Sequence, residues 1–131
     1  MKLGIVVAEF NWDITGVMLQ TALSRAKEKK IETVVVKVPG SFEIPLAAKR
    51  LLEKGVDGVV TLGVIIQGGT SHDEAIAYPV AEKLLELSLS YNKPVALGVA
   101  GPRMSREQAR SRAESFGRNT LDACARMVEE K

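Results

Sequence analysis

Four short apolar runs, each followed by a stretch with helical periodicity, constrain the fold of this chain more than any other feature. The runs span residues 3–8, 33–38, 58–66 and 94–100 and are rich in β-branched side chains. Continuous apolar runs of this length are typical of parallel strands that are covered on both faces. Because strands alternate with helices and crossover connections are right-handed, the pattern predicts a parallel sheet between two helical layers.

We therefore expect a single α/β domain over residues 1–131, folded as a three-layer α/β/α sandwich. Its four-stranded parallel sheet would have the flavodoxin-like strand order 2-1-3-4. The length of 131 residues suits one domain, and a composition of 46% hydrophobic and 26% charged residues supplies enough apolar material for a core.

Capping residues follow three of the four runs, and Pro45 fits the first turn of a helix after the run at residues 33–38. Asp13 or Thr15 is placed to cap the first helix. Two capping boxes overlap at residues 70–73 and 71–74, and a further box occupies residues 105–108. These signals predict a helix that begins within a residue or so of position 72 and another that begins near position 105.

Charge and cysteine content exclude several classes of partner. The net charge of +2 is spread along the chain, with no basic run longer than residues 27–30, which gives no case for nucleic acid. Cys124 is the only cysteine, so an internal disulfide and a cysteine-based metal site are excluded. No signal peptide fits the first residues, and no apolar run approaches the ~18 residues of a membrane span. We expect a cytoplasmic protein that binds neither nucleic acid nor membrane.

The turn at residues 67–72 is the first candidate for a ligand site. It joins the third apolar run to a helix and contains two glycines, two hydroxyl residues and His72, the only histidine. Free backbone N–H groups at a helix start, together with the positive end of the helix dipole, can hold a phosphate. Since the turn lacks the patterns of nucleotide and dinucleotide loops, a small phosphate ester is the ligand that it suits.

His72 is the candidate for proton transfer. An imidazole in the first turn of a helix is favoured in its neutral form, in which it can accept or pass a proton. The alternative, that His72 is a bystander on the helix surface, is left open by the spacing alone.

Three further side chains are candidates at the carboxyl ends of the strands, where ligands bind in sheets of this kind. Phe10 could stack on a flat heterocycle, worth ~1–3 kcal/mol by analogy with base stacking, or it could pack beneath the first helix. Glu43 could bind a ligand or complement a helix dipole. The planar fork of Arg112 suits a phosphate, although a solvated charge is the commoner fate of a helical arginine.

With these residues assembled, the chain resembles the lumazine synthase family over essentially its whole length. The resemblance is carried by residues 8–15, 38–49 and 63–72, and by the pair 108–109 with Arg112. The second and third of these segments are specific in combination, because both their order and their spacing match.

The resemblance implies an activity and an assembly. Residues 98–108 look more like the archaeal branch of the family than the bacterial one. The implied reaction condenses 5-amino-6-(D-ribitylamino)uracil with 3,4-dihydroxy-2-butanone 4-phosphate to 6,7-dimethyl-8-ribityllumazine, with loss of phosphate and water and without a metal or organic cofactor. The implied assembly is a ring of five subunits. A shell of sixty subunits, riboflavin synthase as a partner and a regulatory flavin are left open.

The resemblance also implies the residues that bind the ribitylaminouracil. Phe10 would stack on the pyrimidine, and the residues from position 41 to 43 would bind its edge and ribityl chain. The full set implied for this substrate is Phe10, Ser41, Phe42, Glu43, Val64, Ile65, Ile66 and Leu97.

A second set is implied for the butanone phosphate. Gly69 and Thr70 would hold the phosphate, and Arg112 would reach it from a neighbouring subunit. His72 would move protons during the condensation.

Four departures from the family pattern bear on these expectations. Gln67 stands where bacterial members commonly have a basic residue, which lowers the charge of the phosphate loop and makes Arg112 more important. Leu97 replaces a common aromatic residue in the fourth strand. The lysine that bacterial members carry near the start of the last helix is missing, and Arg118 takes its place only with a one-residue shift. Pro79 should bend its helix, at a cost of ~3 kcal/mol.

Two other functions stay open at this point. An archaeal-type riboflavin synthase would use two lumazine molecules and need no phosphate site, so the presence of Gly69, Thr70 and Arg112 argues against it. The second alternative is a non-catalytic oligomer that binds a flavin or a phosphate ligand.

Overall fold

A four-stranded, all-parallel sheet forms the centre of the protein. The computed structural model describes residues 1–130. The strands are β1 (Lys2–Ala8), β2 (Glu32–Val38), β3 (Gly58–Ile66) and β4 (Val95–Met104). They lie in the order β2-β1-β3-β4, which confirms the predicted order 2-1-3-4.

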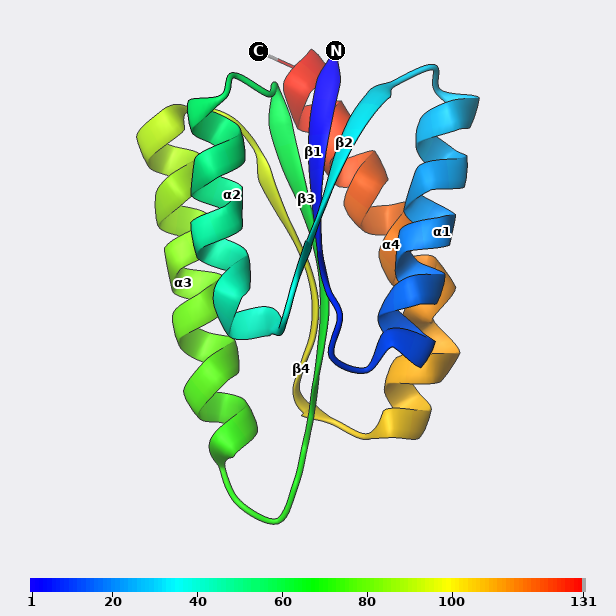
Figure 1. The fold of residues 1–131 in the computed structure, drawn as a ribbon, viewed down its shortest axis with the longest axis vertical. Coiled ribbons are helices and arrows are strands. Elements are labelled where there is room, and N and C mark those ends of the chain that lie inside the picture. The colour runs from blue at the N-terminus through cyan, green and yellow to red at the C-terminus, as the bar shows by residue number, and fades with distance from the viewer. Residues whose placement is uncertain (131) are drawn as a thin grey trace.

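Two pairs of helices cover the two faces of the sheet (Figure 1). One face carries α1 (Trp12–Glu28) and α4 (Arg106–Glu129), and the other carries α2 (Ile44–Glu53) and α3 (His72–Tyr91). A short 3₁₀ helix, η1 (Ser41–Glu43), leads into α2. The predicted α/β/α sandwich is therefore confirmed. None of the helices in residues 1–130 is long and apolar enough to cross a membrane.

The hydrophobic core is divided by the sheet into two clusters. Side chains of β1 and β3 alternate between them: Ile5 and Leu62 pack under α1 and α4, whereas Val6 and Val59 pack under α2 and α3. Each of these four side chains is fully buried, as expected for central parallel strands. Since both clusters rest on one sheet, the strand ends are held in fixed relative positions.

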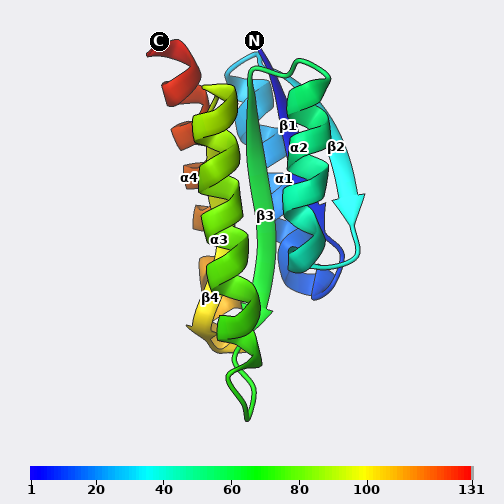
Figure 2. The ribbon, with the colours of Figure 1, turned by 90° about the vertical axis from the view of Figure 1, so that its left-hand side faces the viewer.

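The carboxyl ends of all four strands point to one end of the molecule, and the N-terminus and the end of α4 lie at the other (Figures 1 and 2). The loop between β3 and α3 extends furthest at that end in both views. The candidate loops of the sequence thus meet at one edge of the sheet, which is where a site in such a fold is expected.

Some predicted element boundaries are wrong. The N-cap of α1 is Asn11, which adopts the left-handed conformation (φ 64°), so neither Asp13 nor Thr15 caps this helix. β4 does not stop at residue 100, because its pairing with β3 resumes between Ile66 and Met104 after an irregularity.

Two features of the helices bear on other expectations. Pro79 lies inside α3, which runs without interruption from His72 to Tyr91, and the expected bend stays a prediction. The capping box at the start of α4 is confirmed, because Ser105 Oγ accepts from the Gln108 N–H at 3.1 Å and the Gln108 side chain accepts from the Ser105 N–H at 3.0 Å.

Candidate active site

A cavity of about 720 Å³ opens at the carboxyl edge of the sheet. Residues from the β1–α1 loop, from η1, from the end of β3 and from the start of α3 line it. The lining residues predicted from the sequence are Phe10, Ser41, Phe42, Glu43, Val64, Ile65, Ile66, Thr70 and His72. Most of the predicted set is therefore brought together in one cavity.

Two aromatic rings are exposed at this cavity. The exposed fraction is 71% for Phe10 and 64% for Phe42. Phe10 does not pack beneath α1, so the packing alternative for this residue is wrong. Two phenyl rings left open to solvent beside a cavity provide faces on which a flat ring can stack.

The η1 segment contributes polar groups of two kinds. Ser41 is only 7% exposed, and its Oγ has no hydrogen-bond partner among residues 1–130. The hydroxyl fits against β3 because Gly63 lacks a side chain, since a Cβ there would lie 2.5 Å from Ser41 Oγ. Glu43 Oε1 accepts from the Gly40 N–H at 2.9 Å. This bond fixes the Glu43 carboxylate and leaves Oε2 for a ligand.

The loop between β3 and α3 is tied to the rest of the site at both ends. The Gln67 N–H donates to Met104 O at 2.8 Å, and Thr70 Oγ1 accepts from the His72 N–H at 3.3 Å. Between them, a Cβ at Gly68 or Gly69 would meet no atom within 4 Å. Packing within this chain therefore does not require either glycine, and the space beside them is open.

Helix α3 begins at His72, as predicted, but not through the predicted capping boxes. Ser71 is the N-cap and makes no side-chain capping bond. The two carboxylates of the first turn bind β4 instead, because Asp73 Oδ2 accepts from the Arg103 N–H at 2.9 Å and Glu74 Oε1 accepts from Arg103 Nε at 3.2 Å. The bond to Glu74 raises the pKa of Arg103 above its usual value. These contacts attach the first turn of α3, which begins at the exposed His72, to β4.

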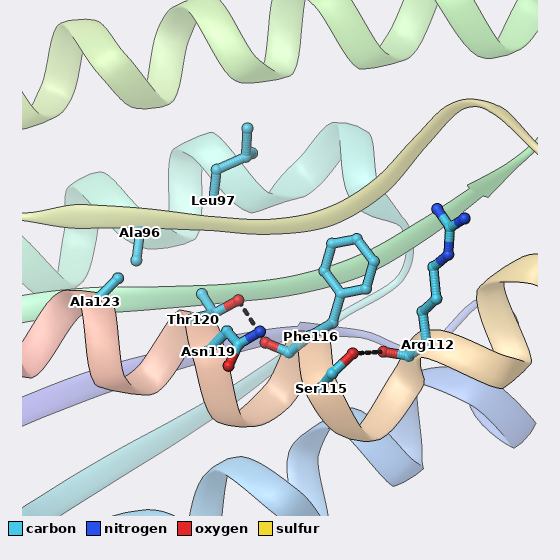
Figure 3. Close-up of a pocket in the computed structure, with 8 residues that line it drawn as sticks. All are labelled: Ala96, Leu97, Arg112, Ser115, Phe116, Asn119, Thr120 and Ala123. Atoms are coloured by element: carbon cyan, nitrogen blue, oxygen red, sulfur yellow. Dashed lines mark hydrogen bonds between the residues drawn. The ribbon is translucent and has the colours of Figure 1, made fainter.

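Leu97 and Arg112 do not join this cavity. They line a separate hollow of about 330 Å³ between β4 and α4, together with Phe116 and Asn119 (Figure 3). Several arginines of the chain form ion pairs with carboxylates, but Arg112 forms none within residues 1–130. Within one chain Leu97 therefore lies apart from the other residues predicted for the uracil site, and its part in that site stays a prediction.

Sequence reasoning missed Arg106 and Asn11, which also line the cavity. The Arg106 guanidinium donates to Asn11 Oδ1 and, at 2.8 Å, to Asp13 Oδ2. Hydrogen bonds from Arg110 and from Arg106 lower the pKa of Asp13. Asn11 could have been predicted from the sequence because it is next to Phe10. Arg106 could not, because no local sequence pattern relates it to its partners more than ninety residues away.

Metal binding and the single thiol are two further features of the described residues that bear on chemistry. No group of three or more His, Cys, Asp or Glu side chains within residues 1–130 could hold a metal ion. Cys124 is buried, and burial raises the pKa of its thiol to about 12. Because the thiolate is the nucleophilic form, this cysteine is unreactive at neutral pH.

Comparison with known proteins identifies the family. A family model described as 6,7-dimethyl-8-ribityllumazine synthase matches residues 1–131. The chain belongs to the lumazine synthase family. Archaeal relatives named 6,7-dimethyl-8-ribityllumazine synthase support the assignment. The relative from Saccharolobus solfataricus is 50% identical over 131 residues, which is 98% of this chain and 85% of the relative. That from Metallosphaera sedula is 52% identical over 130 residues, which is 98% of this chain and 86% of the relative. The residues that match the family model include those that line the cavity and those that line the Arg112 hollow.

Proposed function

We propose that this protein acts in riboflavin biosynthesis as a 6,7-dimethyl-8-ribityllumazine synthase. It condenses 5-amino-6-(D-ribitylamino)uracil with 3,4-dihydroxy-2-butanone 4-phosphate and releases phosphate and water. Membership of the lumazine synthase family supports the activity. The observation that carries the proposal is a single cavity that combines exposed aromatic rings, a buried hydroxyl without a partner among the described residues 1–130, a glycine loop and the only histidine of the sequence.

The pyrimidine substrate occupies the part of the cavity near η1. Phe10 stacks on its ring, and Ser41, Phe42 and Glu43 bind its edge and its ribityl chain. The exposure of Phe10 and the buried hydroxyl of Ser41, which has no partner within residues 1–130, support this placement. A buried polar group without a partner is rare, and a bound pyrimidine would satisfy this one. The backbone of residues 64–66 forms the wall beside the ring.

The phosphate of the second substrate lies at the start of α3. Gly69 and Thr70 hold it, where the open space beside the glycines and the positive end of the helix dipole favour an anion. Arg112 reaches the phosphate from a neighbouring subunit. The separation of the Arg112 hollow from the cavity within one chain supports this arrangement, and Leu97 would reach the pyrimidine in the same way.

His72 moves protons during the condensation. The primary amine of the uracil attacks the ketone carbon, and loss of water gives an imine. Removal of the proton from the carbon beside the imine then expels phosphate and leaves an enol, which tautomerises to a ketone. Attack of the ribityl-bearing nitrogen on this ketone closes the ring, and the ketone oxygen leaves as the second water. Each step transfers a proton close to an anion, and holding the two reactants side by side supplies a large part of the acceleration.

Self-association completes the site in this proposal. The subunits form a ring of five in the cytoplasm, with one site between each pair of neighbours. Exposed leucines on α2 and α3, namely Leu46, Leu85 and Leu89, provide apolar surface for contacts between subunits or between rings. Light scattering on the purified protein measures whether the assembly is a ring of five or a larger shell.

One assay tests the activity and separates it from the alternatives. The purified protein is incubated with the ribitylaminouracil and the butanone phosphate, and lumazine absorbance is followed against the uncatalysed mixture. We expect lumazine to form faster with the protein, and no riboflavin to form from lumazine alone. A rate equal to the uncatalysed rate would reject the proposal, and riboflavin formed from lumazine would favour the riboflavin synthase alternative.

A further inference from the structure

The cavity at the carboxyl edge has a single cationic side chain of the lysine or arginine type. Two carboxylates line it, those of Glu43 and Asp73, whereas Arg106 is the only arginine or lysine among the lining residues. The loop between β3 and α3, where we place the phosphate, carries the neutral Gln67. A phosphate ester with about two negative charges therefore meets one guanidinium from the subunit whose cavity it enters.

Two hydrogen bonds orient this guanidinium. Arg106 Nη1 donates to Asp13 Oδ2 at 2.8 Å, and Nη2 donates to Asn11 Oδ1. The side chain is about half exposed, and Asn11 lines the same cavity. A guanidinium has five N–H donors, so these two bonds fix its plane and leave donors free for a ligand.

Asp13 does not cancel the positive charge around Arg106. The same Oδ2 accepts from Arg110 Nη2 at 2.6 Å, so that two guanidinium groups share one carboxylate. The lowered pKa of Asp13 keeps that carboxylate ionised at neutral pH. One net positive charge therefore remains, and only Arg106 of the two arginines lines the cavity.

We propose that Arg106 is a substrate-binding residue that holds the phosphate of the four-carbon substrate from within the cavity. The inference rests on the proposed function and extends it. The phosphate is bound between two guanidinium groups, Arg106 of the subunit that provides the cavity and Arg112 of its neighbour. The loop can then carry the neutral Gln67, because Arg106 supplies the charge from the start of α4.

Arg106→Gln tests this role, and Arg110→Gln is the matched control. Arg106 and Arg110 both lie on α4, and the guanidinium of each pairs with Asp13 of α1. Only Arg106 lines the cavity. We expect Arg106→Gln to raise KM for the butanone phosphate by about 10- to 100-fold, as expected for the loss of a charge-assisted hydrogen bond. KM for the uracil should stay within about twofold in both variants. Arg110→Gln leaves Asp13 paired with Arg106 alone, so it should raise KM for the butanone phosphate as well, but by a smaller factor than Arg106→Gln because the Arg106 donors remain. Arg106→Lys should recover part of the loss.

Binding of inorganic phosphate, measured by calorimetry on the wild type and both variants, gives a readout that does not require turnover. We expect Arg106→Gln to weaken phosphate binding clearly more than Arg110→Gln does. Equal effects of the two variants, or a rise in KM for the uracil alone, would overturn the assignment. If the wild type makes no lumazine, the proposed function fails, whereas a fully active Arg106→Gln enzyme with unchanged phosphate binding rejects only the role of Arg106.

Discussion

Replacing Ser41 with alanine should stabilise the free protein. The hydroxyl is buried and has no hydrogen-bond partner among residues 1–130. A buried polar group without a partner costs ~1–3 kcal/mol of desolvation. We expect Ser41→Ala to raise the free energy of unfolding by about 1 kcal/mol, at the low end of that range because the hydroxyl lies at a cavity wall. For a chain of this length, the melting temperature should rise by about 4 °C.

The same substitution should weaken substrate binding. In our proposal the Ser41 hydroxyl finds its partner only when the pyrimidine is bound. Loss of one such bond, worth about 1 kcal/mol, should raise Kd for the ribitylaminouracil by about fivefold. Affinity for the butanone phosphate should not change, and calorimetric titration with each substrate measures both quantities.

Thr61→Val is the control for the stability measurement. Thr61 is fully buried, and its Oγ1 donates to Ala96 O at 2.8 Å and accepts from the Gly98 N–H at 3.3 Å. Removing this satisfied hydroxyl leaves buried groups without partners and should lower the free energy of unfolding by ~1–3 kcal/mol. If Ser41→Ala lowers the melting temperature as Thr61→Val does, the Ser41 hydroxyl has a partner in the free protein and the reasoning fails.

Four other substitutions give independent tests. His72→Ala should lower kcat by about 100-fold without abolishing turnover, and an unchanged kcat would make His72 a bystander. Arg112→Ala should raise KM for the butanone phosphate far more than KM for the uracil, and equal changes would show that its role is misassigned. The lowered pKa of Asp13 means that its contribution to stability is full at neutral pH and is lost as pH falls through the lowered value, so Asp13→Asn should flatten the acid limb of a plot of melting temperature against pH. Gly117→Ala should cost ~1–3 kcal/mol of stability, measured by denaturant unfolding, because its Cβ would lie 2.4 Å from a backbone carbonyl oxygen of α1.

The arrangement of strands and helices followed from the sequence because it depends on local hydrophobic pattern. The runs at residues 3–8 and 58–66 are central strands, and both are buried on the two faces of the sheet. Boundaries that depend on distant partners were predicted less well. The carboxylates of Asp73 and Glu74 looked like capping groups, but they bind Arg103, about thirty residues away in the chain.

The cavity could be predicted only in part. Phe10, Ser41 and His72 each follow a strand, so the rule for the carboxyl edge of a parallel sheet places them together. Arg106 was missed because its partner Asp13 is 93 residues away, a separation at which no periodicity links two side chains.

We propose that each active site combines the cavity of one subunit with the Arg112 hollow of its neighbour. The most direct measurement uses His72→Ala and Arg112→Ala proteins that are dissociated, mixed in equal amounts and reassembled. In rings that contain the two variants at random in equal amounts, about a quarter of all sites would combine an intact cavity with an intact hollow. We predict that lumazine formation at limiting butanone phosphate exceeds the mean of the two parent variants after reassembly, but not after mixing without dissociation. Activity equal to that mean, in assemblies shown to contain both variants, would contradict a site shared between subunits.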